Sequence, residues 1–265
     1  MKTQPRARLF APLFIALTAS AWIVLWIWDA GPYARYLHLA DWSDLAGIGA
    51  LCRALPGASA ALAAMLYSAA WLVMIAAMML PTAFPLFDAF ARMTVAREDR
   101  RALIALLIAG YAAAWAIFGL LAHGFDAALH ALVARSPAMF AHAWLVGAAI
   151  AAVAGLYQFS GLKERCLDKC RSPLMFIAGH WRGRSARRES FMLGASHGVF
   201  CVGCCWALML VMFAIGTASV GWMLALGAIM AAEKNLRAGR RIGKPLGVAL
   251  IAWSAWLVVQ HAIIA

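Results

Sequence analysis

Long apolar segments separated by short polar connections form the main pattern of this chain. Seven of them are long enough to cross about 30 Å of hydrocarbon as α-helices, which rise about 1.5 Å per residue. The sixth is the shortest and needs polar residues at its margins to complete a crossing. The predicted spans cover residues 9–28, 59–80, 102–122, 141–160, 191–215, 220–232 and 245–264.

Composition makes this a membrane protein, because 65% of the residues are hydrophobic and 13% are charged. A soluble domain is about half apolar and a quarter charged. We therefore predict an all-α, polytopic transmembrane bundle forming a single domain over residues 1–265. The first segment has the basic start of a signal peptide, but its apolar run continues to Trp28. We interpret it as an uncleaved span.

The distribution of charge predicts orientation and argues against nucleic-acid binding. The net charge is +12, but the basic residues lie in short connections between the spans. Of the 23 Lys and Arg residues, all but Arg35, Arg53 and Arg135 precede span one or lie in the second-to-third, fourth-to-fifth or sixth-to-seventh connection. The positive-inside rule then places the N-terminus in the cytoplasm and the C-terminus outside.

The fifth span contains soft metal-binding side chains in the run HGVFCVGCCWALMLVM, residues 197–212. On an α-helix, five of them fall within an arc of about 100°. Imidazole, thiolate and thioether groups are preferred by Cu(I), with zinc as the borderline alternative. Polar groups at membrane depth are costly and usually functional. The predicted ligands on this face are His197, Cys201, Cys204, Cys205 and Met212.

The second span carries methionines that are expected at comparable depth. Met74 and Met78 share one helix face at a spacing of four residues. Pro81 and Pro85 should break or kink this helix and free backbone carbonyls that need partners inside the bundle. Methionine also fills cores without binding metal. Met79 lies one helical step round from this face. Both interpretations of Met74, Met78 and Met79, as ligands or as packing residues, stay open.

A second cysteine pair lies in the cytoplasmic connection YQFSGLKERCLDKCRSP. The spacing of Cys166 and Cys170 puts both thiols on one face of a helical turn that Ser172-Pro173 should end. The surrounding Lys and Arg residues are expected to lower the pKa of both thiols, which favours metal binding or thiol exchange. The connection leads into the fifth span and could receive or deliver an ion. A basic loop that binds anionic lipid is the alternative.

Two further expectations concern the margins of the spans. The external loop 29–58 has the pattern of a short helix lying on the membrane surface. Glu233 and Lys234, at the cytoplasmic end of the sixth span, are expected to form an interfacial ion pair.

These motifs resemble a family of bacterial integral membrane proteins described as predicted metal-binding and sometimes as copper chaperones. The resemblance lies in AAMMLPTAFP, YQFSGLKERCLDKCRSP, SHGVFCVGCCWALM and GWM with the following AAEK, and it extends from about Ser59 to Ala255. It implies metal binding. By motif match it points to His197, Cys201, Cys204, Cys205, Cys166, Cys170 and Met78.

Together these features predict a seven-span protein that binds a soft metal, Cu(I) first and zinc second. Its site lies between spans two and five, and its partners are the lipid bilayer and a metallochaperone or cuproenzyme. Transport, storage and delivery are not distinguished, and no motif indicates a hydrolytic or group-transfer enzyme. The alternatives are a membrane thiol–disulfide oxidoreductase relaying electrons through the pairs Cys201/Cys204 and Cys166/Cys170, and a scaffold subunit without its own chemistry.

Overall fold

The computed structural model describes residues 10–29, 60–135, 142, 144–215 and 220–264, and every regular element in these ranges is a helix. The all-α prediction is confirmed at this level. The helices are α2 (Phe10–Asp29), α4 (Ala60–Met78), the short 3₁₀ helix η2 (Pro81–Ala83), α5 (Phe84–Met93), α6 (Arg100–Ala134), α8 (Trp144–Tyr157), α9 (Gly161–Arg171), α10 (Pro173–His180), α11 (Ala186–Ile215), α12 (Val220–Asn235) and α13 (Arg240–Ile264).

Each predicted span coincides with a helix, although the bounds differ. The third predicted span ends at residue 122, whereas α6 continues to Ala134. Within the described residues, three helices are long and apolar enough to cross a membrane, or five if each of two bent pairs forms one span. The chain therefore has the helices of a membrane protein, and the count of seven crossings stays a prediction.

The predicted break in the second span is confirmed. α4 ends at Met78, η2 begins at Pro81, and α5 continues at an angle of 47° to α4. Pro81 and Pro85 occupy the first turns of η2 and α5, where a missing N–H is tolerated. The break lies in the buried core, so the backbone groups that it frees need partners inside the protein.

α6 and α11 pack closely, because glycines lie where the two helices meet. A side-chain carbon added to Gly194 would clash with the backbone of Leu107, and one added to Gly110 would clash with the backbone of Phe191. Small residues let helix backbones approach in this way. This contact fixes α11, the helix with three of the cysteines, against α6.

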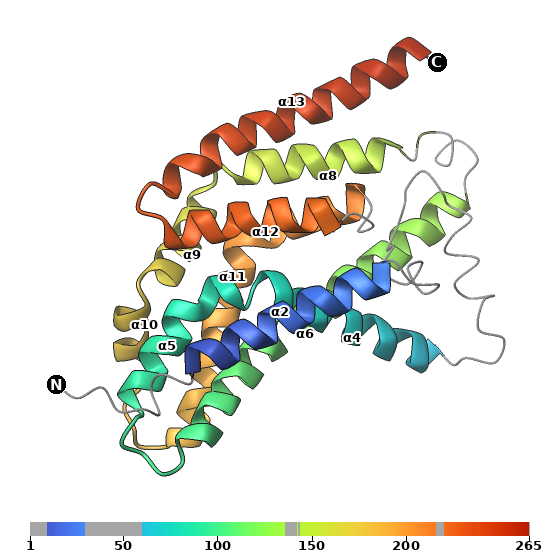
Figure 1. The fold of residues 1–265 in the computed structure, drawn as a ribbon. Helices are drawn as coiled ribbons and strands as arrows, with labels where there is room; N and C mark the ends of the chain where they lie inside the picture. The colour runs from blue at the N-terminus through green and yellow to red at the C-terminus, as the bar shows by residue number, and fades with distance from the viewer. Residues whose placement is uncertain (1–9, 30–59, 136–141, 143, 216–219, 265) are drawn as a thin grey trace.

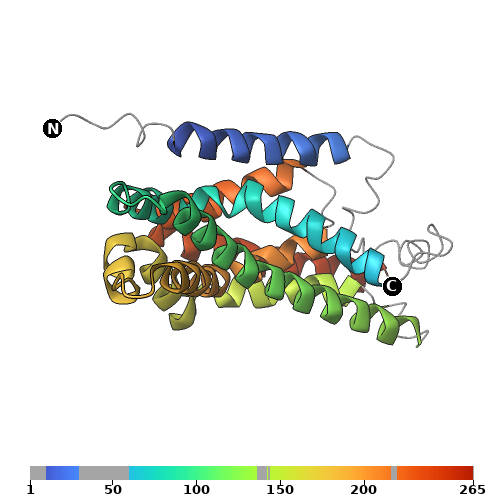
Figure 2. The same cartoon turned by 90° about the horizontal axis from the view of Figure 1, so that it is seen from below.

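The long helices run back and forth across the molecule (Figure 1). As a result, α9, α10, the α5–α6 connection and the α12–α13 connection gather at one end, on the left in Figure 1, and α13 ends at the opposite end. Figure 2, turned by 90°, again shows α9, α10 and the α5–α6 connection at one end, with α2 along one face of the bundle. The predicted surface helix in the external loop lies outside the described residues, apart from Asp29, which ends α2.

Candidate functional site

Cysteines from α9 and α11 come together at the contact between these helices. All five described cysteines are free thiols. The Sγ atoms of Cys170 and Cys204 lie 4.0 Å apart. Cys166 lies beside Gly203, where a side-chain carbon would stand 2.6 Å from its sulfur, so the glycine leaves room for this thiol. We call Cys166, Cys170 and Cys204 the outer thiol group.

The remaining thiols of α11 contact a buried lysine. Nζ of Lys234 is 3.0 Å from Cys201 Sγ, 3.8 Å from Cys205 Sγ and 3.1 Å from the Thr82 hydroxyl. The Tyr111 hydroxyl lies 3.0 Å from Cys201 Sγ. Burying a charge requires a counter-charge or strong hydrogen bonds, and here sulfur and hydroxyl groups provide them.

The break after α4 brings Met79 to the same place. Its backbone carbonyl accepts hydrogen bonds from Thr82 at 2.8 Å and from Tyr111 at 3.1 Å, so the carbonyl freed by the break has partners, as predicted. Its Sδ lies 3.7 Å from Cys205 Sγ. We call Met79, Thr82, Tyr111, Cys201, Cys205 and Lys234 the inner cluster; all of these side chains are buried.

The other predicted ligands are buried in different surroundings. The His197 ring stacks against Tyr111 with centroids 6.1 Å apart and meets Phe176 edge-on at 5.3 Å. Its Nδ1 makes no hydrogen bond within the described part of the chain. Met78 packs on Gly227 of α12, and Met74 and Met212 lie in the core. Their roles as ligands stay predictions.

Sulfur atoms from α9, α11 and the α4 break come together at this site. Among the residues described, no group of three or more His, Cys, Asp or Glu side chains is arranged to hold a metal ion. Cys170 contacts Cys204 across α9 and α11, and Cys205 contacts Met79 across α11 and the α4 break. Both pairs consist of soft donors, which suit Cu(I) better than a hard cation.

The expectation that basic side chains lower the pKa of the α9 thiols is wrong for both cysteines. Hydrogen bonds with Cys201 and Cys204 raise the pKa of Cys170 above its ordinary value. The second thiol is Cys166. Burial raises the pKa of this thiol above its ordinary value. Two of the neighbouring cations are engaged elsewhere, since Lys163 pairs with Glu233 at 2.7 Å and Arg171 donates to the backbone carbonyl of Leu236 at 2.7 Å. Their charges hold α9 in place instead of stabilising a thiolate.

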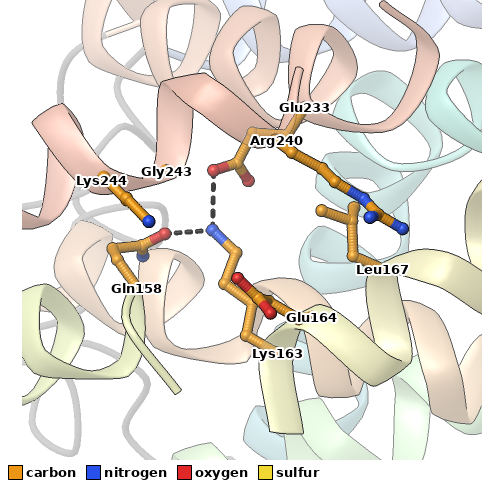
Figure 3. Close-up of a pocket in the computed structure, with 8 residues that line it drawn as sticks. All are labelled: Gln158, Lys163, Glu164, Leu167, Glu233, Arg240, Gly243 and Lys244. Carbon is orange, nitrogen blue, oxygen red and sulfur yellow. Dashed lines mark hydrogen bonds and ion pairs between the residues drawn. The ribbon is translucent and has the colours of Figure 1, made fainter. Parts of the chain in front are cut away.

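A polar pocket beside α9 shows how this anchoring works (Figure 3). The Lys163 ammonium points toward both Glu233 and Gln158, and it donates a hydrogen bond to each. Lys163 and Glu233 are almost fully buried, with side chains 3% exposed. The cavity of about 20 Å³ is large enough for a water molecule and too small for an organic substrate. The pocket ties α9 to α12 and so positions the outer thiol group.

The predicted interfacial pair of Glu233 with Lys234 is wrong. Glu233 pairs with Lys163 of α9, while Lys234 contacts Cys201 and Thr82. Adjacent residues of a helix are about 100° apart, so each side chain faces a different neighbour. Both residues are buried.

Several members of the site were missed by the sequence analysis. Tyr111 lies outside the motifs, and Thr82 lies within AAMMLPTAFP but was not a candidate, whereas Met79 was a candidate ligand beside Met74 and Met78. The signal for Lys234 was present, because an ionisable residue beside an apolar segment indicates a functional position. Its partner could not be read from the sequence, since Cys201 lies on another helix.

Comparison with known proteins adds one match. No curated protein and no solved structure matches this chain significantly. The family model named PpoB2, described as a copper chaperone, matches residues 68–257, a range that includes the outer thiol group and the inner cluster. The chain belongs to this copper chaperone family.

Proposed function

We propose that this membrane protein binds Cu(I) and takes part in copper handling, with Cys170 and Cys204 of the outer thiol group as its first binding site. The observation that carries the proposal is the 4.0 Å separation of Cys170 Sγ and Cys204 Sγ across two helices. Membership of a family described as copper chaperones supports the choice of metal.

The thiol geometry suits Cu(I). A metal about 2.3 Å from each of two sulfurs 4.0 Å apart would see them at an angle of about 120°. That angle leaves room for one further soft donor, such as a donor protein's thiolate. Zinc is almost always bound by four ligands in structural sites, and the described residues contain no group of even three His, Cys, Asp or Glu side chains arranged for a metal. Cu(I) is therefore preferred to zinc.

The proposed topology has seven spans in a bacterial inner membrane, with the N-terminus in the cytoplasm. The end of the molecule that contains α9, α10 and the α5–α6 and α12–α13 connections carries most of the basic residues (Figure 1). Under the positive-inside rule this end faces the cytoplasm. The outer thiols on α9 then exchange copper with a cytoplasmic metallochaperone or a cuproenzyme.

Thiol–disulfide exchange is the second candidate, and the same sulfur pair favours it. Cys170 and Cys204 would lose two protons and two electrons to an acceptor disulfide, form one S–S bond of about 2.05 Å, and reduce that disulfide to two thiols. This requires the two sulfurs to move closer from 4.0 Å.

Anaerobic purification with copper analysis and thiol titration tests the proposal. We expect stoichiometric copper with all thiols reduced in the wild type, and loss of the outer-site copper in Cys170→Ser/Cys204→Ser. The control is Cys52→Ser, which removes one cysteine outside both motifs. Unchanged copper in the double variant contradicts the site. Metal-free protein with a reversible Cys170–Cys204 disulfide supports exchange instead.

A further inference from the structure

The inner cluster contains a second sulfur pair, formed by residues far apart in the sequence. Cys205 Sγ on α11 and Met79 Sδ at the α4 break are 3.7 Å apart. Met79 is fully buried and Cys205 is 1% exposed. A metal about 2.3 Å from both sulfurs would see them at slightly more than 100°. A thiolate and a thioether at this separation can share one Cu(I) ion.

The cluster is already organised around a single positive charge. The Lys234 ammonium lies between Cys201 Sγ at 3.0 Å and Cys205 Sγ at 3.8 Å, with the Thr82 hydroxyl at 3.1 Å. The neighbouring carboxylate of Glu233 is engaged by Lys163. The sulfur atoms are thus the partners that compensate the ammonium, and Cys201 is the nearest.

We propose that the inner cluster is a second Cu(I) site, with Cys205 and Met79 as ligands, in which the Lys234 ammonium holds the cation position until copper arrives. This inference rests on the proposed function, because copper reaches the inner cluster from the outer thiol group. Cys204 and Cys205 are adjacent on α11, so the transfer covers a short distance along one helix. Lys234 is a positioning residue, not a ligand.

The transfer is a ligand exchange without oxidation or reduction. The bonds between Cu(I) and the outer thiolates break, and bonds to Cys205 Sγ and Met79 Sδ form. The proton leaving the Cys205 thiol passes to an outer thiolate. Copper stays Cu(I). The inner cluster gains the Cu(I) charge and loses the Cys205 proton, so its net charge does not change. Exchange of this kind avoids the cost of adding a net charge to a buried site.

Copper titration of the full-length protein in detergent tests the second site. Under anaerobic conditions, Cu(I) is supplied from a colorimetric chelator and the bound ions per chain are measured. We expect two ions in the wild type, and one in both Met79→Leu and Cys205→Ala. Leucine keeps the volume of methionine but lacks its sulfur. Met223→Leu, a buried methionine of α12, is the matched control and should bind two.

Replacing Lys234 should affect copper binding in the opposite direction from replacing Met79 or Cys205. We expect the affinity of Lys234→Met for the inner copper to be at least about tenfold higher, because the ammonium and Cu(I) compete for one site. A lysine with a purely structural role would leave this affinity unchanged or weaken it, and either result overturns the role given to Lys234.

The outcomes separate this inference from the proposed function. Two ions in both Met79→Leu and Cys205→Ala overturn the inner site. One ion in the wild type that is lost in Cys170→Ser/Cys204→Ser but kept in Met79→Leu also overturns it and leaves the proposed function intact. A wild type that binds no Cu(I) overturns both.

Discussion

At the scale of single residues, buried charges hold this site together. Lys163 and Lys234 both extend into the protein interior, but they have different partners: Lys163 a carboxylate and Lys234 two sulfur atoms. The first contact joins helices, and the second places a cation next to thiols. Because a buried charge is costly without its partner, each lysine depends on the group that it contacts.

We expect the Lys163–Glu233 pair to be important for stability. Glu233→Gln leaves the Lys163 ammonium buried without its counter-charge and should reduce the free energy of unfolding by about 3 kcal/mol or more. The double variant Lys163→Met/Glu233→Gln should lose less than the sum of the two single variants, because no unpaired charge remains. The stability losses of the single and double variants are measured by denaturation, monitored through the helical signal in circular dichroism.

Asp168→Asn provides the control on the same helix. Asp168 pairs with Arg240, but the two side chains are 48% and 61% exposed. An exposed ion pair contributes about 1 kcal/mol or less. Equal losses in Asp168→Asn and Glu233→Gln would mean that burial of the Lys163 pair has no special effect.

At the scale of helices, the break near Pro81 decides which methionine reaches the cysteines. The sequence predicts the break, since proline removes a backbone donor. It does not predict that Met79 contacts Cys205, because the face presented after a break depends on the bend. Met78, the last residue of α4, packs on α12 instead. Helical periodicity thus identified the segment but not the contacting residue.

Contacts between helices explain the other differences between prediction and structure. The spacing of Cys166 and Cys170 predicts a shared helix face, and α9 indeed spans both residues and ends at Arg171. That face packs against α11, where Cys170 contacts Cys204. A pairing across two helices leaves no periodic signal in either segment. For the same reason the partners of Glu233 and Lys234 could not be predicted.

The α6–α11 crossing should be sensitive to the size of Gly194. Gly194→Ala puts a methyl group against the backbone of Leu107, which cannot move aside as a flexible side chain can. We expect a loss of about 1–3 kcal/mol, measured by denaturation in detergent. Gly124→Ala on α6, where nothing lies within 4 Å of the added carbon, should be neutral or stabilising by up to about 1 kcal/mol. A neutral Gly194→Ala would show that the helices can separate at little cost.

At the scale of the whole molecule, the alternating helices place basic connections at one end (Figure 1). The same end contains α9 and therefore two of the outer thiols. The inner cluster lies where α11, α12 and the α4 break meet. The sulfur contact between Cys170 and Cys204 thus joins α9, at the basic end, to α11, an arrangement suited to receiving an ion on the basic side.

The seven-span topology makes a specific prediction for α12, which has 16 residues. If α12 crosses the membrane, residues 217 and 237 lie on opposite sides. A membrane-impermeant maleimide should therefore label Thr217→Cys in intact cells, and label Arg237→Cys only after lysis, each measured above the labelling of the wild type. Labelling of both variants from the same side would mean that α12 does not cross. The bundle would then have fewer than seven spans, and the basic connection before α13 would not be assigned to the cytoplasm by alternation.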